Sequence, residues 1–154
     1  MRILVVYDTA SAKRNTEKVA QAISEVLKTK GFDVHCHCVD NVDPASVSNY
    51  DYVLAGSPTQ ALMATKPITE FLDKFAKDEF AGKLAAAFDT QLQAWWSGNA
   101  AKGIEKRLEK LGFKIIMPPL VTYVENKTEE IHLKDGEIEK TRKYAEDLAN
   151  KLSQ

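Results

Sequence analysis

The amino-terminal stretch from Met1 to Thr16, MRILVVYDTASAKRNT, is the part of the sequence that best indicates the fold. Ile3 to Tyr7 form an apolar run of the length expected for a buried strand, and a polar loop follows at once. Beyond the loop, apolar residues recur at helical spacing as far as Leu27. A buried strand that leads through a loop into an amphipathic helix is typical of an α/β protein with a parallel sheet.

The same alternation continues along the chain. Further apolar runs predict strands at residues 32–39, 52–55, 84–88 and 113–124, the last of which bends or splits at Pro118 and Pro119. Apolar stripes predict helices around residues 68–75, 104–111 and 138–152, whereas the turn-rich residues 40–51 have room for a short helical turn at most. Five strands with interleaved helices are compatible with a three-layer α/β/α sandwich whose five-stranded parallel sheet has the order 2-1-3-4-5.

Length and composition restrict the class of protein. The 154 residues fit a single domain, residues 1–154, and a net charge of -1 gives no support for binding nucleic acid. The apolar run at the amino terminus is too short for a signal peptide or a membrane span, so we expect a cytoplasmic protein that binds no membrane. In the sequence His35-Cys36-His37-Cys38 the two residue types point to opposite faces of a strand, so we expect no metal site there.

The predicted topology locates a candidate site before any motif is considered. In the order 2-1-3-4-5 the chain winds in opposite directions from the first and third strands, which leaves a crevice at their carboxyl ends. The segments at this edge are residues 8–16, 56–67 and 88–98, called here the first, second and third loops.

The first loop has features of a phosphate site, and two interpretations of it are open. Hydroxyl groups, the free amides of the helix start, and the cations Lys13 and Arg14 can surround a phosphate. In the other interpretation, Asn15 or Thr16 only caps the helix.

The chain resembles the flavodoxin family along its whole length: in YDT and the following NTEKVA, in VLAGSPT at 53–59, in AAAFDT at 85–90, and in the carboxyl-terminal GFKII and DGEIEKTRKYAEDLA. The resemblance covers essentially the whole chain and implies that FMN is the cofactor. It assigns Thr9, Ser11, Asn15 and Thr16 to the FMN phosphate. Two departures stand out: Arg14 occupies the place of a family glycine, and the loop is about two residues longer, at Ala12 and Lys13.

The second loop is the one that passes its backbone against the flavin ring in the family. The resemblance assigns Ser57, Pro58 and Thr59 to this role. Where many relatives place an aromatic residue, this chain has Leu62 and Met63, which either cover the ring or pack inward.

The third loop carries both tryptophans of the chain. In one interpretation Trp95 or Trp96 stacks on the flavin, and in the other they pack on the following helix or at a dimer contact. Asp89 and Thr90 lie near the start of this loop and are expected beside the cofactor. The charge of Asp8 or Asp89 near the ring would disfavour the addition of an electron to the flavin.

The resemblance implies a small redox protein that transfers electrons through FMN to or from an unidentified redox partner protein. An electron carrier is favoured over a stand-alone enzyme, because reductases of this fold usually carry longer loops for a second substrate, which this chain lacks. If FMN binds, the flavin carries the chemistry and no residue is needed as a general acid or nucleophile. Two alternatives remain: an NAD(P)H- or quinone-linked flavin reductase, and an interaction module that binds FMN weakly or not at all.

Overall fold

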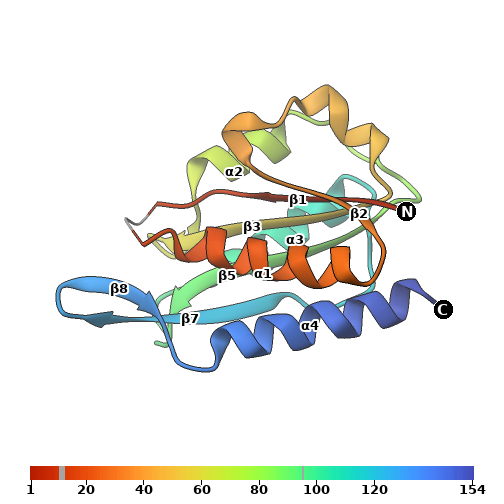
Figure 1. The fold of residues 1–154 in the computed structure, drawn as a ribbon. Coiled ribbons are helices and arrows are strands. Elements are labelled where there is room, and N and C mark those ends of the chain that lie inside the picture. Colours follow the sequence, from red (N-terminus) through yellow and green to blue (C-terminus); the bar gives the residue numbers. More distant parts are fainter. Residues whose placement is uncertain (11–12, 95) are drawn as a thin grey trace.

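Five parallel strands form the centre of the sheet in the computed structural model, which describes residues 1–10, 13–94 and 96–154 (Figure 1). They are β1 (Arg2–Tyr7), β2 (Asp33–Cys38), β3 (Tyr52–Gln60), β5 (Leu84–Leu92) and β7 (Leu120–Lys127). Their spatial order is β2-β1-β3-β5-β7, so the predicted order 2-1-3-4-5 is confirmed.

Three further strands extend this core. β6 (Lys114–Ile115) pairs with the start of β5, and β7 pairs with β5 again from Leu120 onward. The intervening Pro118 and Pro119 have no N–H to donate, so the predicted run at 113–124 splits there. β4 (Met63–Ala64) and β8 (Glu130–Leu133) are antiparallel partners of β3 and β7, and the alternation of apolar runs predicted neither.

Four helices cover the two faces of the sheet. α1 (Asn15–Thr29) and α4 (Glu137–Leu152) pack on one face, and α2 (Lys66–Asp73) and α3 (Ala100–Lys110) pack on the other (Figure 1). Between β2 and β3 the chain forms the 3-10 turns η1 (Val39–Asn41) and η2 (Pro44–Asn49), in agreement with the prediction for residues 40–51.

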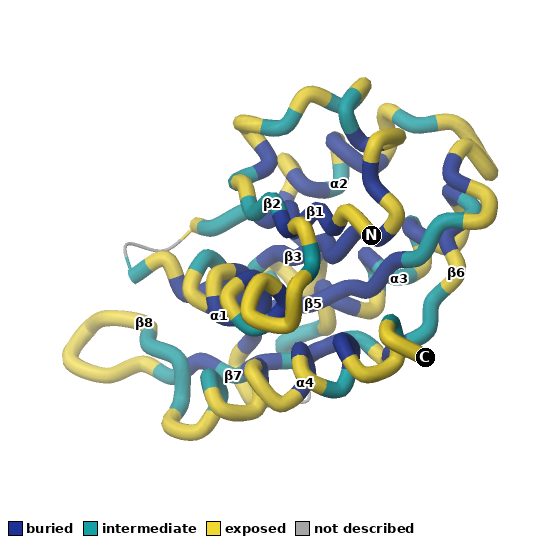
Figure 2. The backbone as a smooth tube through the Cα atoms, turned by 45° about the vertical axis from the view of Figure 1, so that its right-hand side comes forward, coloured by how far each residue is buried: buried dark blue, intermediate teal, exposed yellow. Residues whose placement is uncertain are grey.

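The core lies in two layers, one on each side of the sheet. Successive residues of a strand point to opposite faces, so Leu4 and Val6 pack beneath α2 and α3, whereas Ile3 and Val5 pack beneath α1 and α4. Figure 2 shows the central strands buried and the turn between β7 and β8 exposed. No helix within the described ranges is long and apolar enough to cross a membrane.

Candidate functional site

The three loops and the β7–β8 hairpin meet at a pocket of about 140 Å³ at the carboxyl edge of the sheet. Its walls come from segments that are far apart in sequence. The lining residues are Ala10, Asn15, Thr16, Pro58, Thr59, Gln60, Thr90, Gln91, Leu92, Val124 and Ile131. The crevice predicted from topology therefore exists, and Asn15, Thr16, Pro58, Thr59 and Thr90 are the predicted site residues that line it.

Arg14 has a backbone conformation that favours glycine, the residue that the resemblance to flavodoxins places here. Its φ of 53° and ψ of 47° lie in the left-handed region, which glycine enters without steric cost. The side chain turns back along the helix, where Nη2 donates to Glu17 Oε1 at 2.8 Å. Hydrogen bonds from Arg14 and then from Tyr7 lower the pKa of Glu17 to about 2. Arg14 therefore holds a left-handed conformation at the start of α1, with its side chain paired to the first turn of the helix.

Asn15 and Thr16 do not cap α1, because Arg14 is the capping residue and makes no side-chain capping bond. Both side chains are buried and make long-range contacts instead. Asn15 Nδ2 donates to the Ile131 carbonyl at 2.9 Å, and the hydroxyls of Thr16 and Thr90 lie 2.9 Å apart. These contacts join the first loop to the β7–β8 hairpin and to the third loop.

Two polar atoms in the first loop are buried and make no hydrogen bond to any residue that the structure describes. They are Thr9 Oγ1 and Asn15 Oδ1. Buried polar atoms almost always have a partner, so these two atoms are suited to a ligand with polar groups. Ser11, assigned to the same phosphate, lies outside the described residues.

The second loop is held in a tight turn by its own hydroxyl groups. Ser57 is fully buried, and its Oγ accepts from the Thr65 amide at 2.9 Å and donates to the Pro58 carbonyl at 2.8 Å. Thr65 Oγ1 in turn donates to Asp8 Oδ2 at 2.5 Å, which ties the second loop to the first. The structure thus gives Ser57 a role in shaping the turn.

Leu62 and Met63, at the tip of the second loop, do not pack inward. Their exposed fractions are 62% and 64%. Leu62 forms a bridge to Gly98 at the end of the third loop. A Cβ at Gly98, whose φ is 82°, would overlap the backbone of Leu62, so the two loops touch where only glycine fits.

The third loop places its residues at different depths. Thr90 lines the pocket, whereas Asp89 is fully buried on the opposite face of β5, toward the start of α3. Trp96 is 59% exposed, and Trp95 falls outside the described residues. Packing of Trp96 on the following helix would bury its ring, so its exposure agrees better with a surface that receives a ligand or another molecule.

The β7–β8 hairpin is a wall of the site that the sequence analysis missed. Val124 and Ile131 line the pocket, and the Lys13 ammonium lies 3.0 Å from the Glu130 carboxylate. The first loop is therefore fastened to the hairpin by an ion pair and by the Asn15 amide.

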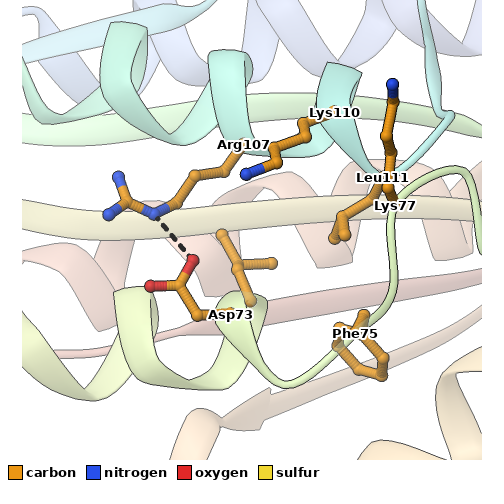
Figure 3. Close-up of a pocket in the computed structure, with 7 residues that line it drawn as sticks. Asp73, Phe75, Lys77, Arg107, Lys110 and Leu111 are labelled. Atoms are coloured by element: carbon orange, nitrogen blue, oxygen red, sulfur yellow. Dashed lines mark hydrogen bonds and ion pairs between the residues drawn. The ribbon is translucent and has the colours of Figure 1, made fainter.

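A larger hollow of about 420 Å³ lies elsewhere, between α2, α3 and the segments that follow them (Figure 3). Arg107 pairs there with Asp73 at 3.2 Å, and Lys77 and Lys110 line the same hollow. None of the site residues predicted from the sequence lines it, so it is distinct from the crevice of the sheet.

A doubly wound sheet of this strand order, with a pocket where the order reverses, is the architecture of the flavodoxin type. Comparison with known proteins identifies the family. Residues 5–143 match the flavodoxin family, and the chain belongs to it.

Three curated relatives match most of this chain. An uncharacterized protein of Methanocaldococcus jannaschii is 30% identical over 116 residues, which are 75% of this chain and 71% of that protein. The type A flavoprotein of Rhodobacter capsulatus is 29% identical over 157 residues, 98% of this chain and 33% of that protein. A second M. jannaschii protein is 28% identical over 151 residues, 95% of this chain and 36% of its own length. The chain thus spans about a third of the length of each of the last two relatives.

Solved structures share the fold over the whole chain. A flavodoxin from the Archaea superposes with a TM-score of 0.78 at 23% identity and covers 100% of both chains. Flavodoxin 2 of Bacillus cereus gives 0.82 at 24% identity, over 98% of this chain and 99% of that one. Rubredoxin oxygen:oxidoreductase of Desulfovibrio gigas gives 0.78 at 20% identity, over 99% of this chain and 36% of that one.

Proposed function

We propose that this chain binds FMN at the carboxyl edge of the sheet and transfers electrons through it. One observation carries the proposal. Apart from Met1, all the large apolar side chains that are exposed within the described ranges lie in the segments round the pocket: Leu62, Met63, Leu92, Trp96 and Ile131. A gathering of exposed apolar groups marks a binding surface, and a flat aromatic ring is the ligand that such a surface suits.

The first loop supplies the polar end of the same site. Thr9 Oγ1 and Asn15 Oδ1, which lack protein partners among the described residues, are suited to the ribityl and phosphate groups of FMN. The amides at the start of α1 add donors and a favourable dipole for an anion. Arg14 adopts a left-handed conformation that a glycine would also adopt, so the substitution does not by itself prevent the loop from turning toward a phosphate.

Bound FMN would supply the redox chemistry, and the protein residues would bind it, orient it and set its surroundings. Thr16 and Thr90 hold the first and third loops at a fixed spacing. Leu62 and Trp96 leave the adjoining surface apolar and accessible, as transfer of an electron to a partner protein requires.

We further propose that the partner is a redox protein or a redox domain. Two comparisons support a redox partner. The chain matches the flavodoxin family, and it also matches about a third of the length of the type A flavoprotein, so in that protein the matching region is one part of a longer chain. A carrier or a flavin module accordingly agrees better with the sequence than a stand-alone enzyme.

Titration of the flavin-free protein with FMN tests the proposal. We expect quenching of flavin fluorescence at a 1:1 ratio, and weaker binding of riboflavin, which lacks the phosphate. Trp96→Ala should weaken the binding of both flavins, whereas Thr9→Ala should weaken FMN more than riboflavin. Lys77→Ala, an exposed position in the hollow of Figure 3, is the control and should leave the affinity unchanged. Absence of FMN binding by the unaltered chain would overturn the proposal.

A further inference from the structure

Asp89 is a carboxylate buried within the fold, one residue away from the lining of the pocket. Its side chain is fully buried, on the face of β5 that packs against α3. The next residue, Thr90, lines the pocket. Burial of a carboxylate is costly unless hydrogen bonds or a cation compensate the charge, so the position of Asp89 calls for a role.

One oxygen of Asp89 ties three segments of the site together. Oδ2 accepts from the Ala101 amide at 3.0 Å, from Gln91 Nε2 at 2.8 Å and from Thr59 Oγ1 at 3.3 Å. Thr59 Oγ1 also accepts from the Ala100 amide at 3.0 Å. The carboxylate therefore fastens the end of β3, which lines the pocket, to the start of α3.

The other oxygen, Oδ1, is buried and has no hydrogen-bond partner among residues 1–10, 13–94 and 96–154. The groups that face the carboxyl from β3, β5 and α3 are Thr59, Gln91 and the Ala101 amide, and from β7 Thr122 donates to the Asp89 carbonyl at 2.6 Å. None of these groups carries a charge or titrates near neutral pH. A negative charge on Asp89 is thus held by hydrogen bonds alone, and burial raises the pKa of the carboxyl to about 6.

We propose that Asp89 is a proton-linked positioning residue: it fastens the second loop to the start of α3, and it takes up a proton when an electron arrives on a flavin held in the pocket. The proposal rests on the proposed function. An electron from a one-electron donor reduces the flavin and adds negative charge next to a buried carboxylate. A proton from solvent then forms an O–H bond on Asp89, so the charge of the site stays the same while the donor is oxidised.

Protonation of Asp89 and reduction of the bound flavin each favour the other. Negative charge in the pocket favours protonated Asp89, and ionised Asp89 disfavours reduction. Asp89 is already protonated below its pKa of about 6, so it takes up a proton on reduction only above that pH. The midpoint potential of the bound flavin should therefore fall as the pH rises from 6 to 8, with a limiting slope of about 59 mV for each tenfold change in proton concentration and one electron.

The experiment compares the unaltered protein with Asp89→Asn, which keeps an oxygen acceptor for Ala101 but carries no titrating proton. FMN-loaded proteins are titrated with dithionite at pH 5, 6, 7 and 8. We expect Asp89→Asn to have the higher potential at pH 8 and a smaller pH dependence between pH 6 and 8. Protons taken up by the flavin itself contribute equally to both proteins. Asp147→Asn, an exposed residue of α4 paired with Lys143, is the control and should match the unaltered protein. Equal pH profiles for Asp89→Asn and the unaltered protein would overturn the proposal.

A second measurement uses the flavin-free protein. Carboxyl carbon NMR of the unaltered chain should show Asp89 titrating near pH 6, and the Ala101 amide should shift with the same midpoint. Titration near the ordinary value of 3.8 would overturn the proposal even if FMN binds tightly. Conversely, failure to bind FMN together with titration near pH 6 would overturn the proposed function and the redox link, but leave the positioning role in place.

Discussion

Arg14 occupies a backbone conformation that costs a residue with a Cβ about 1–2 kcal/mol relative to glycine. Its ion pair with Glu17 offsets part of this cost. Comparison of Arg14→Gly with Arg14→Ala separates the two effects, because both variants lose the ion pair and only alanine keeps the strain. We expect the glycine variant to be the more stable by about 1 kcal/mol in urea unfolding. Equal stability would mean that the loop does not hold this residue in the left-handed region.

Asp89 makes the stability of the fold depend on pH in a direction opposite to that of most carboxylates. Its pKa of about 6 in the folded protein lies above the ordinary value of 3.8, so the folded state retains the proton longer than the unfolded chain. Stability is therefore lost as the pH rises from about 4 to about 6, and a difference of about two pKa units corresponds to roughly 3 kcal/mol. Asp89→Asn does not lose this contribution. As the pH rises from 4 to 8, its free energy of unfolding should therefore increase by roughly 3 kcal/mol relative to that of the unaltered protein. Denaturant unfolding at the two pH values measures it, and a constant difference would contradict the expectation.

Among the elements, the β7–β8 hairpin has a turn that its sequence does not favour. Thr128 and Glu129 both have positive φ, 49° and 66°, in a two-residue connection where Asn-Gly is preferred. Replacing the pair by Asn-Gly should stabilise the hairpin by about 1–2 kcal/mol and slow exchange of the Ile131 amide hydrogen. Thr128→Pro, which fixes φ near −65°, should have the opposite effect on exchange. If the hairpin is a wall of the cofactor site, FMN affinity should change in the same order as hairpin stability.

The contact between the second and third loops depends on Gly98. Gly98→Ala should push the second loop away from the third, because the added methyl meets the backbone of Leu62 rather than a side chain that can move. We expect FMN to bind at least tenfold more weakly, while the far-ultraviolet circular dichroism of the flavin-free protein is unchanged. Gly103→Ala, in α3, adds a methyl where no atom lies within 4 Å and is the control. Unaltered affinity in Gly98→Ala would show that the two loops adjust independently.

At the scale of the whole molecule, FMN should stabilise the fold, because only the folded chain brings the three loops and the hairpin together. At a concentration 100-fold above the dissociation constant the gain is about 2.7 kcal/mol. For a domain of this size that corresponds to a rise of roughly 5–10 °C in the melting temperature. Thermal unfolding with FMN, and with riboflavin for comparison, measures the shift. No shift at saturating FMN would contradict binding to the folded state.

The whole-molecule architecture was predictable because it depends on patterns that are local in sequence. Runs such as Ile3 to Tyr7 alternate with helical stripes, and that alternation leads to the sheet order and to the edge that carries the site. The contacts within the site were not predictable in this way. Asn15 was compatible with a helix cap, and only the folded structure brings it against Ile131. β8 escaped notice because it has four residues and follows a turn without glycine or asparagine.

β8 also has a consequence for how copies of this molecule meet one another. A parallel sheet that ended at β7 would present an eight-residue strand with unpaired backbone groups, a template on which other chains can add strands. The hairpin covers that strand with a partner half as long, which carries Glu130 and His132 and curls back beside the first loop. Short, charged edge strands resist further pairing. Loss of the hairpin should therefore favour edge-to-edge aggregation, so a single segment both encloses the pocket and limits the growth of the sheet.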